Sequence, residues 1–225
     1  MEKMMVVVGL VLACGLLPAL PAHAGGLKLP APRLKGPVSV EEALQARRTQ
    51  RSFTADSLTL EELAQLLWSA YGVTERRGRP RLKTVPSAGA LYPLDIYAAV
   101  GGVTGLKAGV YHYLPPEHAL EQTAERDRRP AVGRAALGQM WLAEAPAVLV
   151  ITGQYDRTTG KYGPRGRGYV LIESGCSAQS LFLQAEALGL KAGIIGAFLD
   201  ADVAQALELP PEHEPLLIMP VGRPR

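Results

Sequence analysis

The run Ala147-Val148-Leu149-Val150-Ile151-Thr152 most constrains the fold, because it is almost entirely apolar and rich in β-branched residues. A run this short and this apolar is typical of a strand buried in the centre of a sheet. The longest helix candidate, Gly168 to Leu190, follows it, and Gly189 is suited to end that helix. Its expected broad apolar face consists of Leu171, Ala178, Leu181, Phe182, Ala185 and Leu188. A buried strand followed by a long helix predicts helices layered on a central sheet.

Two capping boxes mark the first helices of the chain. Ser39-Val40-Glu41-Glu42 predicts a helix that runs toward Arg47, and Thr59-Leu60-Glu61-Glu62 predicts a second helix. The remaining signals predict, in chain order, a solvated loop at Glu75 to Lys83, a strand at Leu94 to Val100, a hairpin at Val110 to Leu120, a helical stretch at Arg129 to Trp141, a strand from Ile194, a helix at Ala201 to Leu207 and a strand at Leu216 to Val221.

The order of these elements favours one fold class. Helices and apolar strands are interleaved, but a hairpin interrupts them, and no Gly-rich turn connects a strand to a helix. This pattern predicts an α+β fold with helices over a mostly antiparallel or mixed sheet, rather than a doubly wound Rossmann domain. No internal repeat is visible, and residues 38–225 are expected to form a single domain.

Residues 1–24 are expected to be a secretory signal peptide. An apolar run from Met4 to Leu17 is followed by helix-breaking prolines and the small-residue end Ala22-His23-Ala24. A permanent membrane anchor would need about twenty uninterrupted apolar residues, so no span is expected after cleavage. The alternative is lipoprotein processing at Cys14, which follows Val11-Leu12-Ala13. We therefore expect an exported protein, with the periplasm as its location.

The first residues after the signal, 25–37, contain three glycines and three prolines, which predicts an extended tether. Cys176 would be the single thiol left after cleavage, so no internal disulfide is possible and stability must come from packing or subunit pairing. We interpret Cys176 as a small buried residue at a helix or dimer contact rather than as a nucleophile.

Several classes of function lack their sequence signals. The formal net charge of +3 says little about nucleic acid, and no nucleic-acid-binding motif is present. The histidines His23, His112, His118 and His213 have no metal-ligand spacing, so no metal site is expected. A Gly-x-Ser-x-Gly elbow is also missing, which argues against that type of serine hydrolase.

A basic cluster stands where the first predicted helix ends. Arg47, Arg48 and Arg51 flank the hydroxyl of Thr49. This set suits a phosphate monoester, because each guanidinium offers a planar fork of donors that matches phosphate oxygens. Taken alone, the cluster is also typical of a solvated basic helix end, where arginine suits the helix dipole.

A small-residue loop, Pro86-Ser87-Ala88-Gly89-Ala90-Leu91-Tyr92-Pro93, follows the basic cluster along the chain. Small residues bracketed by prolines allow a rigid backbone to come close to a flat ring. Taken alone, the loop could equally be a Pro/Gly turn before a strand.

The basic cluster and the small-residue loop, in this order, resemble the FMN-dependent nitroreductase superfamily, and specifically its SagB-type dehydrogenase branch. The resemblance covers about Val38 to Arg223. It implies a three-layer α+β homodimer with FMN bound at the subunit interface.

The resemblance also implies which residues bind the cofactor. The phosphate of FMN would be held by the residues that match the N-terminal pattern of relatives, Arg47, Arg48, Thr49 and Arg51. Arg223, which matches a C-terminal position of relatives, would add a further phosphate contact. The isoalloxazine and ribityl chain would pack against Pro86, Ser87, Ala88, Gly89, Ala90 and Leu91. The backbone of a later segment would line the flavin ring, at Gly193, Ile194, Ile195 and Gly196.

The pair Lys161-Tyr162 is the most specific chemical signal. It resembles the Lys-Tyr pair of azoline oxidases in this branch, which oxidise peptide thiazolines and oxazolines to azoles. Hydride removal requires a proton to leave the neighbouring atom, and a lysine or tyrosine beside the ring can accept it. One lysine and one tyrosine at a helix end can also be plain surface residues.

We therefore expect an oxidoreductase that transfers hydride between a small organic substrate and FMN. Because NAD(P)H is a cytosolic reductant, an exported enzyme of this kind would oxidise a substrate and pass electrons to oxygen, a quinone or a partner. The alternatives are an NAD(P)H-dependent nitro or quinone reductase and, from another class, a non-catalytic flavin- or ligand-binding protein.

Overall fold

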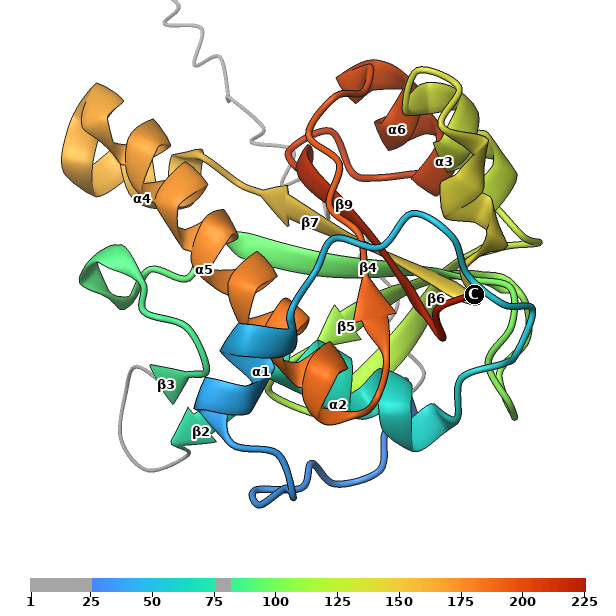
Figure 1. The fold of residues 1–225 in the computed structure, drawn as a ribbon. Helices are drawn as coiled ribbons and strands as arrows, with labels where there is room; N and C mark the ends of the chain where they lie inside the picture. Colours follow the sequence, from blue (N-terminus) through green and yellow to red (C-terminus); the bar gives the residue numbers. More distant parts are fainter. Residues whose placement is uncertain (1–25, 76–81) are drawn as a thin grey trace, which may run out of the picture.

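A central antiparallel sheet organises the fold in the computed structural model, which describes residues 26–75 and 82–225 (Figure 1). Seven strands pair in the order β1-β6-β5-β4-β7-β9-β8, and every pairing between them is antiparallel. In that order their bounds are Leu27–Lys28, Ala119–Glu125, Gly109–Leu114, Leu94–Val100, Ala147–Gly153, Glu214–Gly222 and Lys191–Ala192. The predicted signal peptide, including Cys14, and residues 76–81 of the predicted loop lie outside the described residues.

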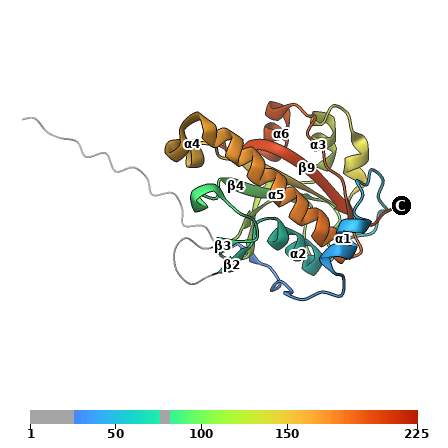
Figure 2. The same cartoon turned by 60° about the vertical axis from the view of Figure 1, so that its left-hand side comes forward.

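Helices cover both faces of the sheet, as the two views in Figures 1 and 2 show. Alternate residues of β4 point to opposite faces: Leu94 and Ile96 join the core beneath α2 and α5, whereas Tyr97 joins the core beneath α3 and α6. The helices are α1 Val40–Ala46, α2 Leu60–Tyr71, α3 Arg129–Ala135, α4 Asp156–Tyr162, α5 Gly166–Ala187 and α6 Asp200–Leu207. The predicted α+β fold with a mostly antiparallel sheet is therefore confirmed.

Local chemistry begins α1 and α2 where the sequence predicts. The hydroxyl of Ser39 accepts a hydrogen bond from the Glu42 amide, and the Glu42 carboxylate accepts one from the Ser39 amide. Thr59 and Glu62 form the same reciprocal pair at the start of α2. Each pair satisfies backbone donors that have no partner inside the helix.

The structure corrects three of the predicted elements in the first half of the chain and in α5. Leu27 and Lys28, predicted to lie in a tether, pair with β6 as an edge strand. Leu82 and Lys83, predicted to be solvated loop, form β3 and pair with β2 Val73–Glu75. Leu171, predicted to lie on the apolar face of the long helix, is 52% exposed.

Two further corrections concern the second half. The helical stretch predicted from Arg129 to Trp141 is broken, because Leu137 and Gly138 both have positive φ, and a 3-10 helix then spans Met140–Glu144. The strand predicted to begin at Ile194 is β8, three residues earlier, and Ile195 contributes an isolated bridge to Ile218. In the described part of the chain, no helix is both long enough and apolar enough to cross a membrane.

Candidate functional site

The small-residue loop has an unusual backbone. Gly89 has φ 61°, and two residues that carry a Cβ, Ala90 and Tyr92, also have positive φ at 54° and 50°. The left-handed region costs such residues about 1–2 kcal/mol each. The Ser87 hydroxyl accepts a hydrogen bond from the Tyr92 amide at 2.9 Å, and the Ser87 carbonyl accepts one from the Ala90 amide at 3.0 Å. Ser87 therefore holds the loop in its strained shape.

The side chains of Lys161 and Tyr162, at the end of α4, reach this loop at Gly89. A methyl group placed on Gly89 would lie 2.7 Å from Tyr162 Oη and 2.8 Å from Lys161 Nζ. Such distances are far shorter than van der Waals contact, so any larger residue at position 89 would displace both side chains. The structure thus brings together three residues that the sequence analysis had placed in one site.

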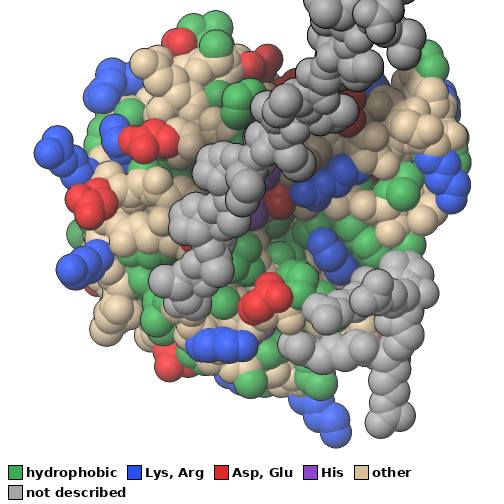
Figure 3. Space-filling model, turned by 180° about the vertical axis from the view of Figure 1, so that it is seen from behind, with side chains coloured by type: hydrophobic (Ala, Val, Ile, Leu, Met, Phe, Trp, Pro, Cys, Tyr) green, Lys and Arg blue, Asp and Glu red, His purple; other side chains and the backbone are tan. Residues whose placement is uncertain are grey.

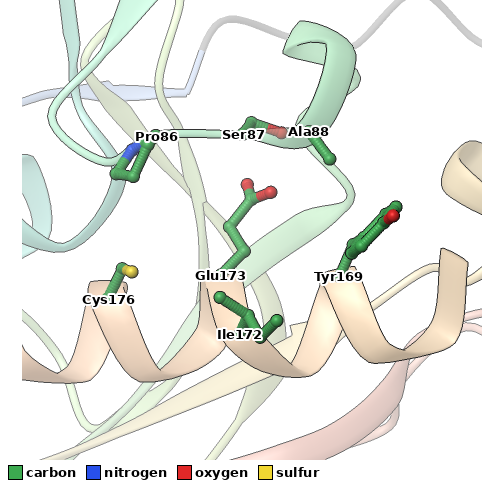
Figure 4. Close-up of a pocket in the computed structure, with 7 residues that line it drawn as sticks. All are labelled: Pro86, Ser87, Ala88, Tyr169, Ile172, Glu173 and Cys176. Atoms are coloured by element: carbon green, nitrogen blue, oxygen red, sulfur yellow. The ribbon is translucent and has the colours of Figure 1, made fainter. Parts of the chain in front are cut away.

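A pocket of about 320 Å³ lies between the small-residue loop and α5. In Figure 4 the Glu173 carboxylate points from α5 toward Ser87, with Tyr169 and Cys176 on the same side of the helix. The lining residues are Pro86, Ser87, Ala88, Tyr169, Ile172, Glu173 and Cys176. Cys176 was expected to be a small buried residue at a helix or dimer contact. It is only half-buried and lines this pocket.

Glu173 is a candidate functional residue that the sequence analysis missed. Its side chain is almost fully buried, with the residue 3% exposed, and it accepts a hydrogen bond from Tyr71 Oη at 2.7 Å. Burial raises the pKa of Glu173, although hydrogen bonds from Ser87 and Tyr71 and the charge of Lys83 partly oppose the rise. One sequence signal could have indicated Glu173: it places a carboxylate among the apolar positions on the inward side of the long helix.

Lys83 lies behind this carboxylate. Its ammonium group is 3.6 Å from the ring centroid of Tyr71 and 4.9 Å from that of Tyr92. Burial lowers the pKa of Lys83 to about 8, against the opposing pull of nearby carboxylates. The sequence analysis assigned Lys83 to a solvated basic loop, which is wrong for this residue.

The predicted phosphate-binding residues gather at the other end of α5. The Arg47 guanidinium lies 5.1 Å from the ring centroid of Phe182, near the last turns of that helix. Thr49 forms a bridge with Ala192, and the Arg223 carbonyl accepts a hydrogen bond from the Thr54 amide at 3.0 Å. The structure therefore joins the basic cluster to the C-terminal arginine and to the start of the glycine segment.

The guanidiniums of this group differ in their partners. Arg48 donates to the carbonyls of Gln45 and of its neighbour Arg47, as expected for an arginine at the end of a helix. Arg223 forms an ion pair with Glu62 at 3.0 Å. Within the described residues, neither Arg47 nor Arg51 forms an ion pair with a carboxylate. These two are the arginines best able to bind an added anion.

The two glycines of the later segment are required for different reasons. A methyl group on Gly193 would lie 2.7 Å from the Gln50 carbonyl oxygen, so packing against the basic cluster already accounts for this glycine. A methyl group on Gly196 would meet no atom within 4 Å. Between them, Ile194 is 37% exposed and Ile195 is buried. Gly196 and Ile194 therefore offer an open surface, whereas Gly193 and Ile195 belong to the packed structure.

The predicted site residues thus form two groups within the chain. The first group is the basic cluster with Gly193 to Gly196 and Arg223, and the second is the small-residue loop with Lys161 and Tyr162. Both views place the loop beside α4 at one end of α5, whereas α1 and the C-terminus lie toward the other end (Figures 1 and 2). Along α5, Glu173 and Phe182 are nine residues apart, or about 14 Å at the rise of an α-helix.

A second polar cluster occupies the opposite face of the sheet, where histidine and acidic side chains gather near the middle of the view in Figure 3. Asp95 Oδ1 is 3.0 Å from His112 Nε2, and Asp95 Oδ2 is 3.1 Å from the Arg157 guanidinium of α4. The ring of His213 hydrogen-bonds Tyr97 Oη at 2.7 Å. This cluster fastens the start of α4 to the sheet.

The charges in this second cluster are set by their neighbours. Burial would raise the pKa of Asp95, but the hydrogen bond with His112 and the charge of Arg157 outweigh burial and lower it. Burial lowers the pKa of His213, with the Asp95 charge opposing the change. Within residues 26–75 and 82–225, no group of three or more His, Cys, Asp or Glu side chains is arranged to hold a metal ion.

Comparisons with known proteins agree with this fold. Residues 44–223 match the model of the nitroreductase family. The chain is 45% identical over 186 residues to the "Putative nitroreductase" of Methanocaldococcus jannaschii, covering 83% of this chain and 91% of that one. It is 29% identical over 159 residues to the microcin B17-processing protein McbC of Escherichia coli, covering 68% of this chain and 58% of McbC. The solved structure of a Ralstonia eutropha protein, described in the same words as the archaeal one, has a TM-score of 0.77 at 29% identity, covering 94% of this chain and 96% of that one.

Proposed function

Because the chain belongs to the nitroreductase family, we propose that it is an FMN-dependent oxidoreductase that acts as a homodimer on a small organic substrate. When bound, FMN would supply a ring that accepts or gives hydride. The observation that carries the proposal is the approach of Lys161 and Tyr162 to Gly89 in the strained loop. A proton-transfer pair fixed against a small-residue loop suits hydride transfer to a flat ring, because a proton must leave or arrive at the neighbouring atom.

The basic cluster supports the phosphate part of the proposal. Arg47 and Arg51 would hold the FMN phosphate, since within the described residues no carboxylate competes for either guanidinium. The Thr49 hydroxyl lies between them in the chain and would donate a further hydrogen bond. Arg48 and Arg223 would contribute long-range charge, because their donors already have partners. Gly196 leaves open space on the same side of the fold.

The separation of the two groups supports the homodimer. In one protomer the basic cluster and the small-residue loop lie toward opposite ends of α5 (Figure 2). We propose that a second copy brings its loop, with Lys161 and Tyr162, to the basic cluster of the first. Exposed apolar side chains on α1 and α5, at Val40, Leu44, Leu171 and Ile172, would be covered in such a dimer.

For the direction of the reaction, we favour oxidation of the substrate, as in SagB-type dehydrogenases. This choice rests on the similarity to McbC and on the expected export of the chain through its N-terminal signal. Reduction of nitro compounds or quinones with NAD(P)H is the second candidate, and the nitroreductase name of the archaeal relative favours it.

Three measurements on the purified mature chain test the proposal. A flavin spectrum and a native mass of two chains are expected. Anaerobic mixing with NADPH alone separates the two candidates, because rapid bleaching of the flavin would favour the reductase. A protein that binds flavin but shows no dehydrogenase, oxidase or reductase activity would be a binding protein, and one that fails to bind FMN would refute the proposal.

The shared site has a sharper test. Chains carrying Arg51→Glu are co-expressed with chains carrying Lys161→Ala, each variant being inactive alone. If each site combines the basic cluster of one protomer with the loop of its partner, every mixed dimer has one site free of both changes. Random pairing then restores about a quarter of wild-type activity. If each site is built within one protomer, every site carries a change and no activity returns.

A further inference from the structure

The pocket between α5 and the small-residue loop contains one carboxylate, that of Glu173. The rest of its lining is mainly apolar, with Pro86, Ile172 and Cys176 among the walls and Ser87 as the other polar group near the carboxylate. The Glu173 carboxylate points toward the loop rather than into solvent (Figure 4). A carboxylate in such a place is costly to the fold unless partners satisfy it.

Those partners come from three elements: α2, the small-residue loop and β3. Tyr71 Oη, from α2, donates to it at 2.7 Å and itself accepts a hydrogen bond from the Leu94 amide at 3.1 Å. Ser87, from the loop, lies where the carboxylate points (Figure 4), and Lys83, from β3, adds a positive charge behind the Tyr71 ring. This shell fixes the carboxylate while one side of it stays open to the pocket.

The balance of these contacts makes Glu173 suited to proton exchange. Burial moves the pKa of its carboxyl upward from 4.5, toward the pH at which an enzyme works. Tyr71 stays protonated, because burial and the neighbouring carboxylate raise its pKa strongly. Lys161 and Tyr162, in contrast, are not among the residues that line this pocket, and the Lys161 side chain is exposed.

We propose that Glu173 is a catalytic residue that exchanges a proton with a substrate bound between α5 and the small-residue loop, an inference that rests on the proposed oxidoreductase function. The apolar walls favour an uncharged substrate with an N–H or O–H next to the carbon that is oxidised. As the C=N or C=O bond forms, the N–H or O–H proton goes to the Glu173 carboxylate rather than to Lys161 or Tyr162, which in this step position the small-residue loop at Gly89. The hydride from carbon carries both electrons to the flavin, and reduction of a substrate reverses both transfers.

The test compares Glu173→Gln with a matched control, Glu186→Gln. Glu186 is on the same helix, its side chain is 5% exposed and it pairs with Lys191, but it is remote from the pocket. We expect Glu173→Gln to keep FMN affinity and native mass and to lose about 100-fold or more in turnover, together with the acid limb of its pH profile. Glu186→Gln should keep both turnover and profile.

A readout on the full chain without FMN separates this inference from the proposed function. Infrared titration should show a carboxylic acid that loses its proton above the ordinary glutamate range, present in the wild type and in Glu186→Gln and missing in Glu173→Gln. If FMN does not bind, the proposed function fails while this band still reports the proton on Glu173. If the band is missing in the wild type, or Glu173→Gln turns over with the wild-type profile, the inference is wrong.

Tyr71→Phe provides a second variant should Glu173→Gln unfold. It keeps the ring and removes the hydrogen bond that lowers the Glu173 pKa. The acid limb of the rate profile and the infrared transition should therefore both move to higher pH. An unchanged profile would overturn the role of Glu173, because a merely structural carboxylate would not set the position of that limb.

Discussion

Replacement of Gly89 by alanine tests whether Lys161 and Tyr162 act at the small-residue loop. The added methyl group would lie 2.7 Å from Tyr162 Oη and 2.8 Å from Lys161 Nζ, whereas ordinary contact begins near 3.4 Å. Both groups end flexible side chains, so each must retreat by about 0.6–0.7 Å. Since a displacement of about 1 Å in a catalytic group can cost about 100-fold, we expect turnover to fall roughly 10- to 100-fold.

The cost to the fold is set by the backbone. Alanine at φ 61° costs about 1–2 kcal/mol relative to glycine. For a domain of this size the melting temperature should fall by about 2–4 °C per kcal/mol. Gly105→Ala is the matched control, because Gly105 has φ 79° and a methyl group there would meet no atom within 4 Å. The two variants should therefore lose similar stability, and only Gly89→Ala should lose turnover.

The assay measures reduction of a quinone or nitroaromatic at saturating FMN, with FMN affinity measured separately by flavin fluorescence. FMN affinity must be measured separately from turnover, because the small-residue loop is itself proposed to contact the flavin. If Gly89→Ala and Gly105→Ala turn over equally well at saturation, then the positions of Lys161 and Tyr162 beside the loop have no part in the reaction.

Three further predictions follow from the cited contacts. Arg51→Glu should weaken FMN binding in equilibrium dialysis by about tenfold or more, since a charged hydrogen bond contributes about 1.5–3 kcal/mol. Arg48→Glu should have a smaller effect, and equal effects would contradict the proposal that Arg51 rather than Arg48 holds the FMN phosphate. The pKa of Asp95 is lowered, so its stabilisation is present above pH 3.8 and is lost as pH falls through the folded value. Asp95→Asn should therefore cost about 1–3 kcal/mol at neutral pH and flatten the acid limb of the unfolding curve. Leu67→Ala, at a fully buried position, should cost about 2–5 kcal/mol in denaturant unfolding, and Leu34→Ala, 79% exposed, should cost under about 0.5 kcal/mol.

The elements that the sequence predicts well are those whose cause is local. The Ser39 and Thr59 caps start α1 and α2 because their bonding partners are only three residues away. β4 spans Leu94–Val100 as predicted, since a short, mostly apolar stretch that follows a proline favours a buried strand. The approach of Lys161 and Tyr162 to the loop, in contrast, is a tertiary contact that only the family resemblance could suggest.

Tertiary contacts also explain what the sequence could not indicate. Lys83 lies in a basic stretch that looks solvated, yet the ring of Tyr71 and the carboxylate of Glu173 draw it inward. Arg223 looks like a free phosphate ligand, and its pairing with Glu62 depends on two residues 161 positions apart. Leu27 and Lys28 look like tether because their pairing strand, β6, lies far along the chain.

Several departures from ordinary folding rules lie together at the interface between α5 and the small-residue loop, although four other residues that carry a Cβ have positive φ elsewhere in the described chain. Ala90 and Tyr92 adopt φ values that cost each residue about 1–2 kcal/mol. Beside them, a carboxylate and an ammonium group, on Glu173 and Lys83, lie in surroundings that shift both pKa values toward neutrality. Such costs persist only where the surrounding structure enforces them, and they cluster where a protein acts. The interface between α5 and the small-residue loop is therefore the part of the molecule where chemistry, rather than folding, best explains the choice of residues.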